Sequence, residues 1–367
     1  MVIGVPREIM EAERRVAVIP ETVRELVGAG HAVRVEKGAG EGSNIADQSY
    51  VEAGAEITDA RTVWEASDIV MKVKEPLKSP AFGVLESDLL RQGACLVGFL
   101  HPANHPEMIC RFRDRGLITI SMDCIPRSEE TREMDALASM SMIAGYKAVI
   151  LAADHLPEMM GGCQTPVATL RGSRVLIVGY GVVGRQAAAT ARGLGAEVAV
   201  VDVRDEAVRR AEEDGYMGVY VPGHDDEAVR ATVDAEAPRS DVVILGALVF
   251  GEHAPVLLTR AAVEKMRPDS VVVDVSVDQG GNCEIVRPGE IYRHNGVTIV
   301  GILNLPGRLP VHSTQLYARN ICRFVLHLTR GGVLNLDDPI VRAATITRDG
   351  QVVHEGTLKA IHAAGLA

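Results

Sequence analysis

Residues 174–184 read Arg-Val-Leu-Ile-Val-Gly-Tyr-Gly-Val-Val-Gly, an apolar run that ends in a glycine-rich turn. The apolar residues predict a buried strand, and the three glycines have the spacing G-x-G-x-x-G. In a dinucleotide-binding turn the first glycine, here Gly179, permits the tight turn, and the second, Gly181, lets the backbone approach a pyrophosphate. The third, Gly184, lets the following helix pack closely on the strand. The spacing therefore predicts a nucleotide-binding turn between a strand and a helix.

The sequence after this turn has the remaining parts of a dinucleotide fingerprint. The Ala-rich residues 185–194 predict a helix, whose first N–H groups favour phosphate charge. A second strand, 197–201, leads into Asp202, which can accept hydrogen bonds from the adenosine ribose hydroxyls and would repel a 2′-phosphate. We therefore expect NAD as the cofactor, with NADP as the lesser alternative because Arg204 follows two residues later.

The composition is that of an ordinary globular protein and excludes several classes of function. The 367 residues are 47% hydrophobic and 24% charged, and the net charge of −11 argues against nucleic-acid binding. The six cysteines have no paired spacing and predict reduced thiols, which favours a cytoplasmic location. Because the N-terminus has no signal-peptide pattern and no apolar run reaches about 18 residues, we expect no membrane segment.

Strand-like and helix-like segments alternate along the chain, which predicts an α/β protein with doubly wound parallel sheets and helices on both faces. The central part of the chain has six expected strands, the number of a complete dinucleotide domain: 174–178, 197–201, 218–221, 241–245, 270–275 and 297–302. The N-terminal part has further expected strands at 2–5, 32–35, 69–73, 95–100 and 118–122.

The fingerprint lies in mid-sequence, which predicts a cofactor domain inserted into a second domain. We expect a Rossmann domain at 134–306 and a substrate domain formed by 1–133 and 307–367. Long helices, one at 134–157 and one beginning near Ser313, would join the two. The cleft between two such domains is then the expected active site.

Titratable residues at predicted strand ends are candidates for substrate binding and proton transfer. Ligands of open α/β sheets bind beyond the carboxyl ends of strands, where Lys74 and His101 follow predicted strands. Arg15 and Lys74 could clamp a carboxylate, and a histidine suits proton transfer at neutral pH. His105 is a competing candidate, and solvated or capping roles stay open for all four residues.

The predicted cofactor domain supplies two more candidates. Asp278 lies on a Gly-rich loop after strand 270–275, where a carboxylate can orient a water molecule or only begin an Asx turn. Asn304 follows the last predicted strand, and the small residues Gly246 and Ala247 suit a place where a nicotinamide riboside lies near the backbone. No His/Cys cluster has the spacing of zinc ligands, so no metal is expected.

Read together, these segments resemble the superfamily of alanine dehydrogenases and proton-translocating transhydrogenase alpha subunits. The matching motifs run along almost the whole chain and comprise Gly4-Val5-Pro6-Arg7-Glu8, Arg15-Val16-Ala17, Val73-Lys74-Glu75-Pro76, Met134-Asp135-Ala136-Leu137-Ala138-Ser139-Met140, Ala144-Gly145-Tyr146, the glycine fingerprint, Gln279-Gly280-Gly281-Asn282 and Leu305-Pro306-Gly307-Arg308-Leu309-Pro310.

The resemblance leaves two branches of this superfamily open. Several sequence motifs are similar to those of the NAD-binding component of transhydrogenases, among them Asp123-Cys124-Ile125-Pro126-Arg127 and Leu305-Pro306-Gly307-Arg308. That component has an Arg-Gln-Asp constellation that meets the partner's nicotinamide. The matching positions here are Arg127, Arg132 and Asp135, so an arginine replaces the glutamine.

The residues expected in the active site are instead similar to those of alanine dehydrogenases. The resemblance implies substrate binding by Arg15, Lys74 and Asn304, and catalysis by His101 and Asp278. Transhydrogenase components usually lack that aspartate and carry Asp in place of the asparagine. Because a bare hydride donor needs no acid–base pair, a chain with both the histidine and the aspartate is expected to move protons as well.

We therefore expect NAD-dependent oxidative deamination of a small L-amino acid, alanine by default, to the 2-oxo acid, or the reverse reductive amination. The alternatives are a transhydrogenase alpha component, an opine- or saccharopine-type dehydrogenase, and an inactive NAD sensor. The expected partners are the small-molecule substrate and further copies of the chain, as a dimer or hexamer. The residues expected at the cofactor are Ser141, Gly179, Gly181, Val182, Val183, Gly184, Asp202, Ala247 and Leu248.

Overall fold

A computed structural model describes residues 1–221, 225–247 and 254–366 of the chain, which forms two compact units. The first unit consists of Met1–Met140 and Gly307–Ala367, and the second consists of Ser141–Pro306. Each unit has its own sheet, and the six parallel strands of each sheet follow the same doubly wound order.

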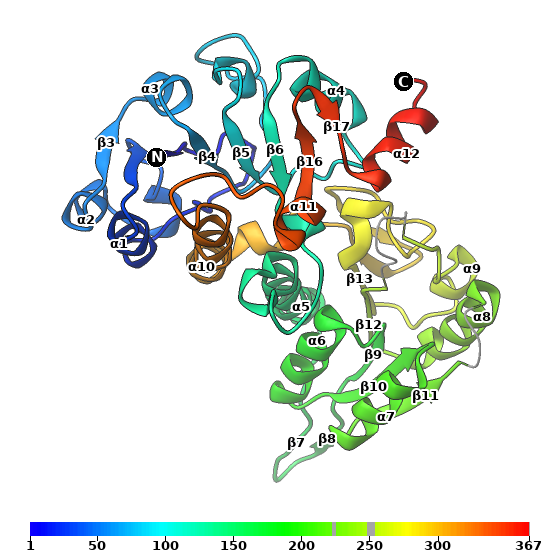
Figure 1. Ribbon diagram of the computed structural model, residues 1–367. Coiled ribbons are helices and arrows are strands. Elements are labelled where there is room, and N and C mark those ends of the chain that lie inside the picture. The colour runs from blue at the N-terminus through cyan, green and yellow to red at the C-terminus, as the bar shows by residue number, and fades with distance from the viewer. Residues whose placement is uncertain (222–224, 248–253, 367) are drawn as a thin grey trace. The chain divides into compact units, whose positions relative to one another are not determined.

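The sheet of the first unit has its parallel strands in the order β3-β2-β1-β4-β5-β6. Two antiparallel strands, β16 and β17, extend this sheet beyond β6 (Figure 1). The strands are β1 (Val2–Val5), β2 (Ala32–Glu36), β3 (Glu56–Thr58), β4 (Ile69–Met71), β5 (Cys95–Gly98), β6 (Ile118–Ser121), β16 (Thr345–Arg348) and β17 (Gln351–Val352).

Helices cover both faces of this sheet because successive side chains of a strand point to opposite faces. Ile69 and Met71 belong to the hydrophobic core on one face, whereas Val70 belongs to the core on the other. The first core is closed by α1 (Pro20–Gly28), α2 (Asp47–Glu52), α10 (Pro310–Leu328) and α11 (Pro339–Ala344). The second is closed by α3 (Ala60–Glu65), α4 (Pro106–Asp114) and α12 (Glu355–Ala363).

The sheet of the second unit has the order β11-β10-β9-β12-β13-β15-β14, in which only β14 is antiparallel to its neighbour. Its strands are β9 (Arg174–Val178), β10 (Glu197–Asp202), β11 (Met217–Tyr220), β12 (Val242–Leu245), β13 (Val271–Asp274), β14 (Ile291–His294) and β15 (Val297–Val300). A separate hairpin is formed by β7 (Cys163–Gln164) and β8 (Thr169–Leu170).

The strand β9 again divides its side chains between two cores. Val175 and Ile177 pack with α5 (Ala136–His155), α6 (Val182–Gly193) and α7 (Asp205–Glu213). Leu176 and Val178 pack with α8 (Asp226–Glu236) and α9 (Arg260–Val263) on the other face. The short apolar strand of the fingerprint is therefore buried on both faces, as a central parallel strand requires.

The predicted fold class, α/β with doubly wound sheets, is confirmed, but both sheets carry antiparallel strands at one edge. The strands β3, β14, β16 and β17 were not predicted. Several predicted strands end early, and the largest differences are at β4, β5 and β15, which end at Met71, Gly98 and Val300, two residues before the predicted ends. Two residues past β4 and β5 the backbone N–H groups bond side chains, since Val73 N–H donates to Glu8 and Leu100 N–H donates to Ser121.

The helix α5 is long and apolar enough to cross a membrane, by length and composition only. Its apolar 18-residue window has a mean hydropathy of 1.6, although Lys147 interrupts the apolar run. Core helices have the same composition, and α5 contributes Ala144, Ala148 and Ala152 to the buried core of the second unit. Its apolar character is therefore used in packing.

Candidate active site

The three glycines of the fingerprint occupy the turn between β9 and α6, and each has a different reason to lack a side chain. Gly179 has a φ of +89°, and a Cβ on Gly184 would lie 1.8 Å from the carbonyl oxygen of Gly179. Gly181 is the N-cap of α6, and a Cβ there would meet no protein atom within 4 Å. The turn is thus tightly packed on the protein side and open at Gly181, as the approach of a pyrophosphate requires.

The valines after Gly181 have a packing role in the structure. Val182 is half-buried and Val183 is buried in the first turn of α6. A Cβ on Gly145 of α5 would lie 2.3 Å from the carbonyl oxygen of Val183, so glycine permits the close approach of the two helices. Ser141 is half-buried in α5.

Asp202 ends β10 and is already engaged by its neighbours. One carboxylate oxygen accepts the backbone N–H of Tyr180 at 2.6 Å, and the Arg204 guanidinium donates to both oxygens at 2.9 and 3.0 Å. Burial disfavours the charge, but the hydrogen bonds from Arg204 and Tyr180 lower the pKa of Asp202 below its usual value. The carboxylate is therefore ionised and partly neutralised by a cation whose side chain is 47% exposed.

The loop after β13 is organised by Asp274, which is fully buried. Its carboxylate accepts the backbone N–H groups of Ser276 at 3.0 Å, Asn282 at 2.7 Å and Cys283 at 2.8 Å. Burial raises the pKa of Asp274 to about 6 despite these three bonds. This side chain folds the Gln-Gly-Gly-Asn motif back onto the end of its strand.

Asn282 connects that loop to the segment after β12. Its amide oxygen accepts the N–H of Ala247 at 3.1 Å, and its amide nitrogen donates to the carbonyl oxygens of Ala247 at 2.9 Å and Pro255 at 2.8 Å. The predicted cofactor residue Leu248 lies outside the described residues. Asn282 is fully buried, so these bonds fix the position of Ala247.

The structure brings Asp278 and Asn304 together within the second unit. Asp278 lies on the 3-10 helix Val275–Gln279, and its side chain is exposed. The backbone nitrogen of Asn304 lies 3.3 and 3.4 Å from the two oxygens of this carboxylate. Asn304 has a φ of +52°, a conformation that asparagine tolerates better than most residues.

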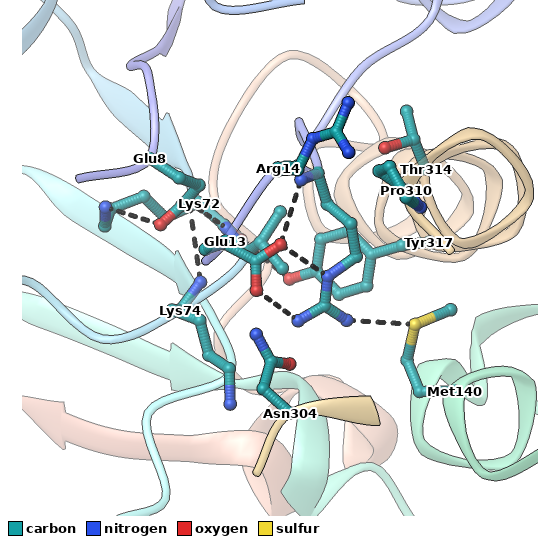
Figure 2. A network of polar contacts seen from close by, with 12 residues as sticks. Glu8, Glu13, Arg14, Lys72, Lys74, Met140, Asn304, Pro310, Thr314 and Tyr317 are labelled. Carbon is teal, nitrogen blue, oxygen red and sulfur yellow. Dashed lines mark hydrogen bonds and ion pairs between the residues drawn. The ribbon is translucent and has the colours of Figure 1, made fainter. Parts of the chain in front are cut away.

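In the first unit, Arg15 is buried rather than displayed at the surface, with 2% of the residue exposed. Its Nε and backbone N–H donate to Glu13 at 2.8 and 2.9 Å, and its Nη1 lies 3.1 Å from the sulfur of Met140. Figure 2 shows Glu13 and Met140 at the two ends of this network, with Tyr317 beside it. Carboxylate binding by Arg15 stays a prediction.

Lys72 forms the centre of a second buried network, which sequence reasoning did not identify. Its ammonium lies 2.9 Å from Glu8 and 3.2 Å from Glu86, and all three side chains are at most 3% exposed. Burial raises the pKa of Glu8, and the nearby ammonium of Lys72 only partly offsets that effect. Glu8 also accepts the N–H groups of Val73 at 2.6 Å and Lys74 at 3.4 Å (Figure 2). The network therefore fixes the backbone on which Lys74 is carried.

His101 lies in the loop after β5 and faces a carboxylate. Its Nδ1 is 3.5 Å from Glu75, and Nε2 of His105 is 3.7 Å from the other oxygen of the same carboxylate. Burial alone would raise the pKa of Glu75, but His101, a backbone hydrogen bond and Lys74 together lower it to about 2. Glu75 is thus ionised across the physiological range and lies between both candidate histidines.

Glu75, Asp274 and Asn282 are further contributors that sequence reasoning missed. Glu75 and Asn282 lie inside quoted motifs and Asp274 lies in a predicted strand, but their partners are distant in the sequence or are backbone groups. The available signal was an acidic or amide residue next to apolar ones, because a polar group that is buried there needs hydrogen-bond partners.

Family models match most of the chain. The model described as alanine dehydrogenase/PNT, N-terminal domain, matches residues 4–144. The model described as alanine dehydrogenase/PNT, C-terminal domain, matches residues 148–355.

Relatives from both branches are similar to this chain at nearly equal identity. NAD(P) transhydrogenase subunit alpha of Cereibacter sphaeroides is 36% identical, over 96% of this chain and 71% of its own length. Alanine dehydrogenase of Bacillus subtilis is 35% identical, over 98% of this chain and 94% of its own length. Overall identity therefore does not separate the two activities.

Solved structures give the same result. A transhydrogenase from Sinorhizobium meliloti has a TM-score of 0.89 and 35% identity, over 96% of this chain and 100% of the other. An L-alanine dehydrogenase has a TM-score of 0.87 and 33% identity, over 100% of both chains. The choice between the branches rests on individual residues.

Proposed function

Because this chain belongs to the family of alanine dehydrogenases and NAD(P) transhydrogenase alpha subunits, we propose that it is an NAD-dependent amino-acid dehydrogenase. Its substrate would be a small L-amino acid, with alanine as the default. In the oxidative direction the amino acid, NAD⁺ and water give the 2-oxo acid, NH₄⁺, NADH and one proton. The enzyme can run in reverse as a reductive aminase.

The second unit has the residues that would hold NAD, the cofactor of this family. The N–H groups at the start of α6 suit the pyrophosphate, and Gly181 leaves room beside them. Asp202 suits the ribose hydroxyls, with Arg204 adjusting its position as the ribose binds. Bound NAD⁺ supplies a hydride acceptor, and the protein supplies orientation and proton transfer.

The proposed roles of the remaining residues follow from their chemistry. Arg15 and Lys74 bind the carboxylate and the amino or keto end of the substrate. His101 exchanges the proton that accompanies oxidation of the amino group, and Asp278 orders the water that attacks the imine. Asn304 holds the Asp278 carboxylate through its backbone N–H.

The pair formed by Asp278 and Asn304 is the observation that carries this proposal. A subunit that only passes a hydride to a second nucleotide has no water to activate and no proton to move. An exposed carboxylate oriented by a backbone N–H suits hydrolysis of an imine, and it supports the dehydrogenase over the hydride donor.

The deciding experiment measures NADH formation by the purified chain with a panel of L-amino acids. We expect turnover with at least one small amino acid, and no turnover for His101→Gln in spite of normal NADH binding. A parallel reaction offers an NADP analogue as the hydride acceptor in the presence of NADH. Absence of deamination with every amino acid would reject the dehydrogenase.

The second candidate, a transhydrogenase alpha component, is favoured by one contact. Nε of Arg127 lies 3.4 Å from Asp135, whose other oxygen accepts the N–H of Ala138 in the first turn of α5 at 2.7 Å. Two members of the Arg-Gln-Asp constellation are thus paired, whereas Arg132 is paired with Glu129 at 3.2 Å. In this role the chain would need a separate NADP-binding partner and a membrane partner.

We further infer that the first unit is the substrate domain and the second is the cofactor domain. A cytoplasmic location and a homo-oligomeric state, dimer or hexamer, accompany the dehydrogenase proposal. Size-exclusion chromatography with light scattering measures the oligomeric state.

A further inference from the structure

The side chain of Glu75 is 12% exposed, and two histidines pair with it in the described part of the chain. A carboxylate with so little solvent needs partners that hold its charge. One oxygen faces Nδ1 of His101 and the other faces Nε2 of His105. His101 and His105 follow Glu75 by 26 and 30 positions in the sequence, so the sequence pattern did not predict either contact.

The backbone that carries Glu75 is held from both sides. On one side Glu8 accepts the N–H of Val73, and the Tyr317 hydroxyl donates to the carbonyl oxygen of Lys72 at 2.6 Å. On the other side Glu86 accepts the N–H of Leu77 at 3.0 Å. Because these partners are buried, the turn presents the Glu75 carboxylate at a defined place.

His101 is also restricted, so the contact joins two fixed groups. Its φ of +44° lies in the left-handed region that few non-glycine residues adopt, and its carbonyl oxygen accepts the N–H of Asn104 at 2.9 Å. Its ring stacks on Phe99 with 5.9 Å between the ring centroids, and Phe99 packs on Tyr317 at 5.2 Å. Backbone strain of this kind persists where the surrounding structure enforces it.

We propose that Glu75 is a positioning residue that holds the proton of neutral His101 on Nδ1 and so leaves the lone pair on Nε2 for proton exchange. A carboxylate beside one imidazole nitrogen selects the tautomer and orients the ring. The same carboxylate stabilises the imidazolium that forms when Nε2 accepts a proton. This inference rests on the proposed function, in which His101 exchanges the proton.

His105 faces the same carboxylate with the opposite nitrogen and provides the matched control. It is the N-cap residue of α4, and burial lowers its pKa. His105 faces Glu75 with Nε2, whereas His101 faces it with Nδ1. The Nε2 atom is therefore engaged by the carboxylate in His105 and left available in His101. The geometry assigns proton exchange to His101 and no role in the reaction to His105.

The test combines a tautomer measurement with kinetics on the full-length chain. Protein labelled with ¹⁵N-histidine is examined by NMR above neutral pH, and the His101 signals are identified by their loss in His101→Gln. We expect the Nδ1–H tautomer in the wild type and the Nε2–H tautomer in Glu75→Ala. The nearly isosteric Glu75→Gln keeps an acceptor oxygen and should retain part of the Nδ1–H form.

In amino-acid oxidation, we expect Glu75→Ala to lower kcat about 100-fold and Glu75→Gln about tenfold. The KM for the amino acid and the Kd for NADH should stay within about twofold, which a general loss of structure would not produce. His105→Gln should retain kcat within about threefold. A wild-type Nε2–H tautomer of His101, or an unchanged kcat in Glu75→Ala, overturns the inference. If no amino acid is oxidised at all, the proposed function fails, and the tautomer spectra still decide the role of Glu75.

Discussion

The backbone nitrogen of Asn304 lies 3.3 Å from one carboxylate oxygen of Asp278 and 3.4 Å from the other. This contact fixes an exposed carboxylate on the loop after β13 through a residue that follows β15. Two strands that are separated in the sequence therefore cooperate in presenting one acid–base group.

Replacement of Asp278 by Asn tests the role of that carboxylate. The amide keeps a carbonyl oxygen for the N–H of Asn304 but has no charge with which to orient and deprotonate water. We expect kcat for deamination to fall about 10²- to 10⁴-fold, with an unchanged Tm and normal NADH binding by fluorescence titration. Near-normal turnover in this variant would remove Asp278 from the reaction.

Two glycine substitutions separate cofactor binding from folding. In Gly181→Ala the new methyl group enters open space, so Tm should be unchanged while the Kd for NADH rises at least tenfold, about 1.4 kcal/mol. In Gly184→Ala the methyl group would lie 1.8 Å from the Gly179 oxygen, which should cost about 3 kcal/mol of stability. Equal effects of the two substitutions on Tm would contradict this division.

The contact between Arg204 and Asp202 predicts the cofactor preference. The guanidinium partly neutralises the carboxylate, which weakens the repulsion of a 2′-phosphate. We expect Arg204→Ala to bind NADPH about tenfold more weakly relative to NADH, because the carboxylate then faces the phosphate alone. Isothermal titration with both nucleotides measures the ratio, and a shift toward NADPH would show that Arg204 acts differently.

The alternation of strands and helices predicted both doubly wound sheets because central parallel strands are apolar runs. The run 175–178 is one example, and all four of its residues are buried. The edge strands β3 and β14 were missed for the opposite reason: β3 has three residues and β14 alternates exposed with half-buried positions. Neither has enough apolar surface to give a distinct pattern.

The candidate site was predictable where a residue type alone indicates a chemistry. Asp202 and the glycines belong to a local fingerprint, and the turn at Gly184 is tight enough to explain why glycine is required. The pairing of Glu75 with His101 was not predictable, because it depends on two loops that meet only in the folded sheet. Asp274 was also missed, since its partners are backbone N–H groups of a loop that it folds itself.

The raised pKa of Asp274 predicts a pH-dependent stability. Between pH 3.8, the ordinary value, and about 6, the unfolded chain ionises this carboxyl while the folded chain retains its proton. The folded state then binds more protons, so stability falls as pH rises through this window and is constant above it. The loss is on the order of 3 kcal/mol.

Asp274→Asn provides the measurement, because an amide does not titrate. The variant should be less stable overall, since one amide oxygen must serve three backbone N–H groups. Its urea midpoint should nevertheless lose the decrease between pH 4 and 6 that we expect for the wild type. If the urea midpoints of the two proteins change with pH in the same way, a group other than Asp274 is responsible for the pH dependence.

Arg127 distinguishes the two activities of the family within this chain. Its side chain is 56% exposed and pairs with Asp135 at 3.4 Å, and exposed pairs of this kind contribute about 0–1 kcal/mol. Arg127→Ala should therefore leave Tm unchanged.

For an amino-acid dehydrogenase, kcat and the KM for the amino acid should also stay within about twofold, because Arg127 has no assigned role in deamination. For a transhydrogenase component, hydride transfer to an NADP analogue held by a partner subunit should fall about tenfold or more. Loss of hydride transfer to the NADP analogue in Arg127→Ala, when the wild-type preparation oxidises no amino acid, would support the transhydrogenase over the dehydrogenase.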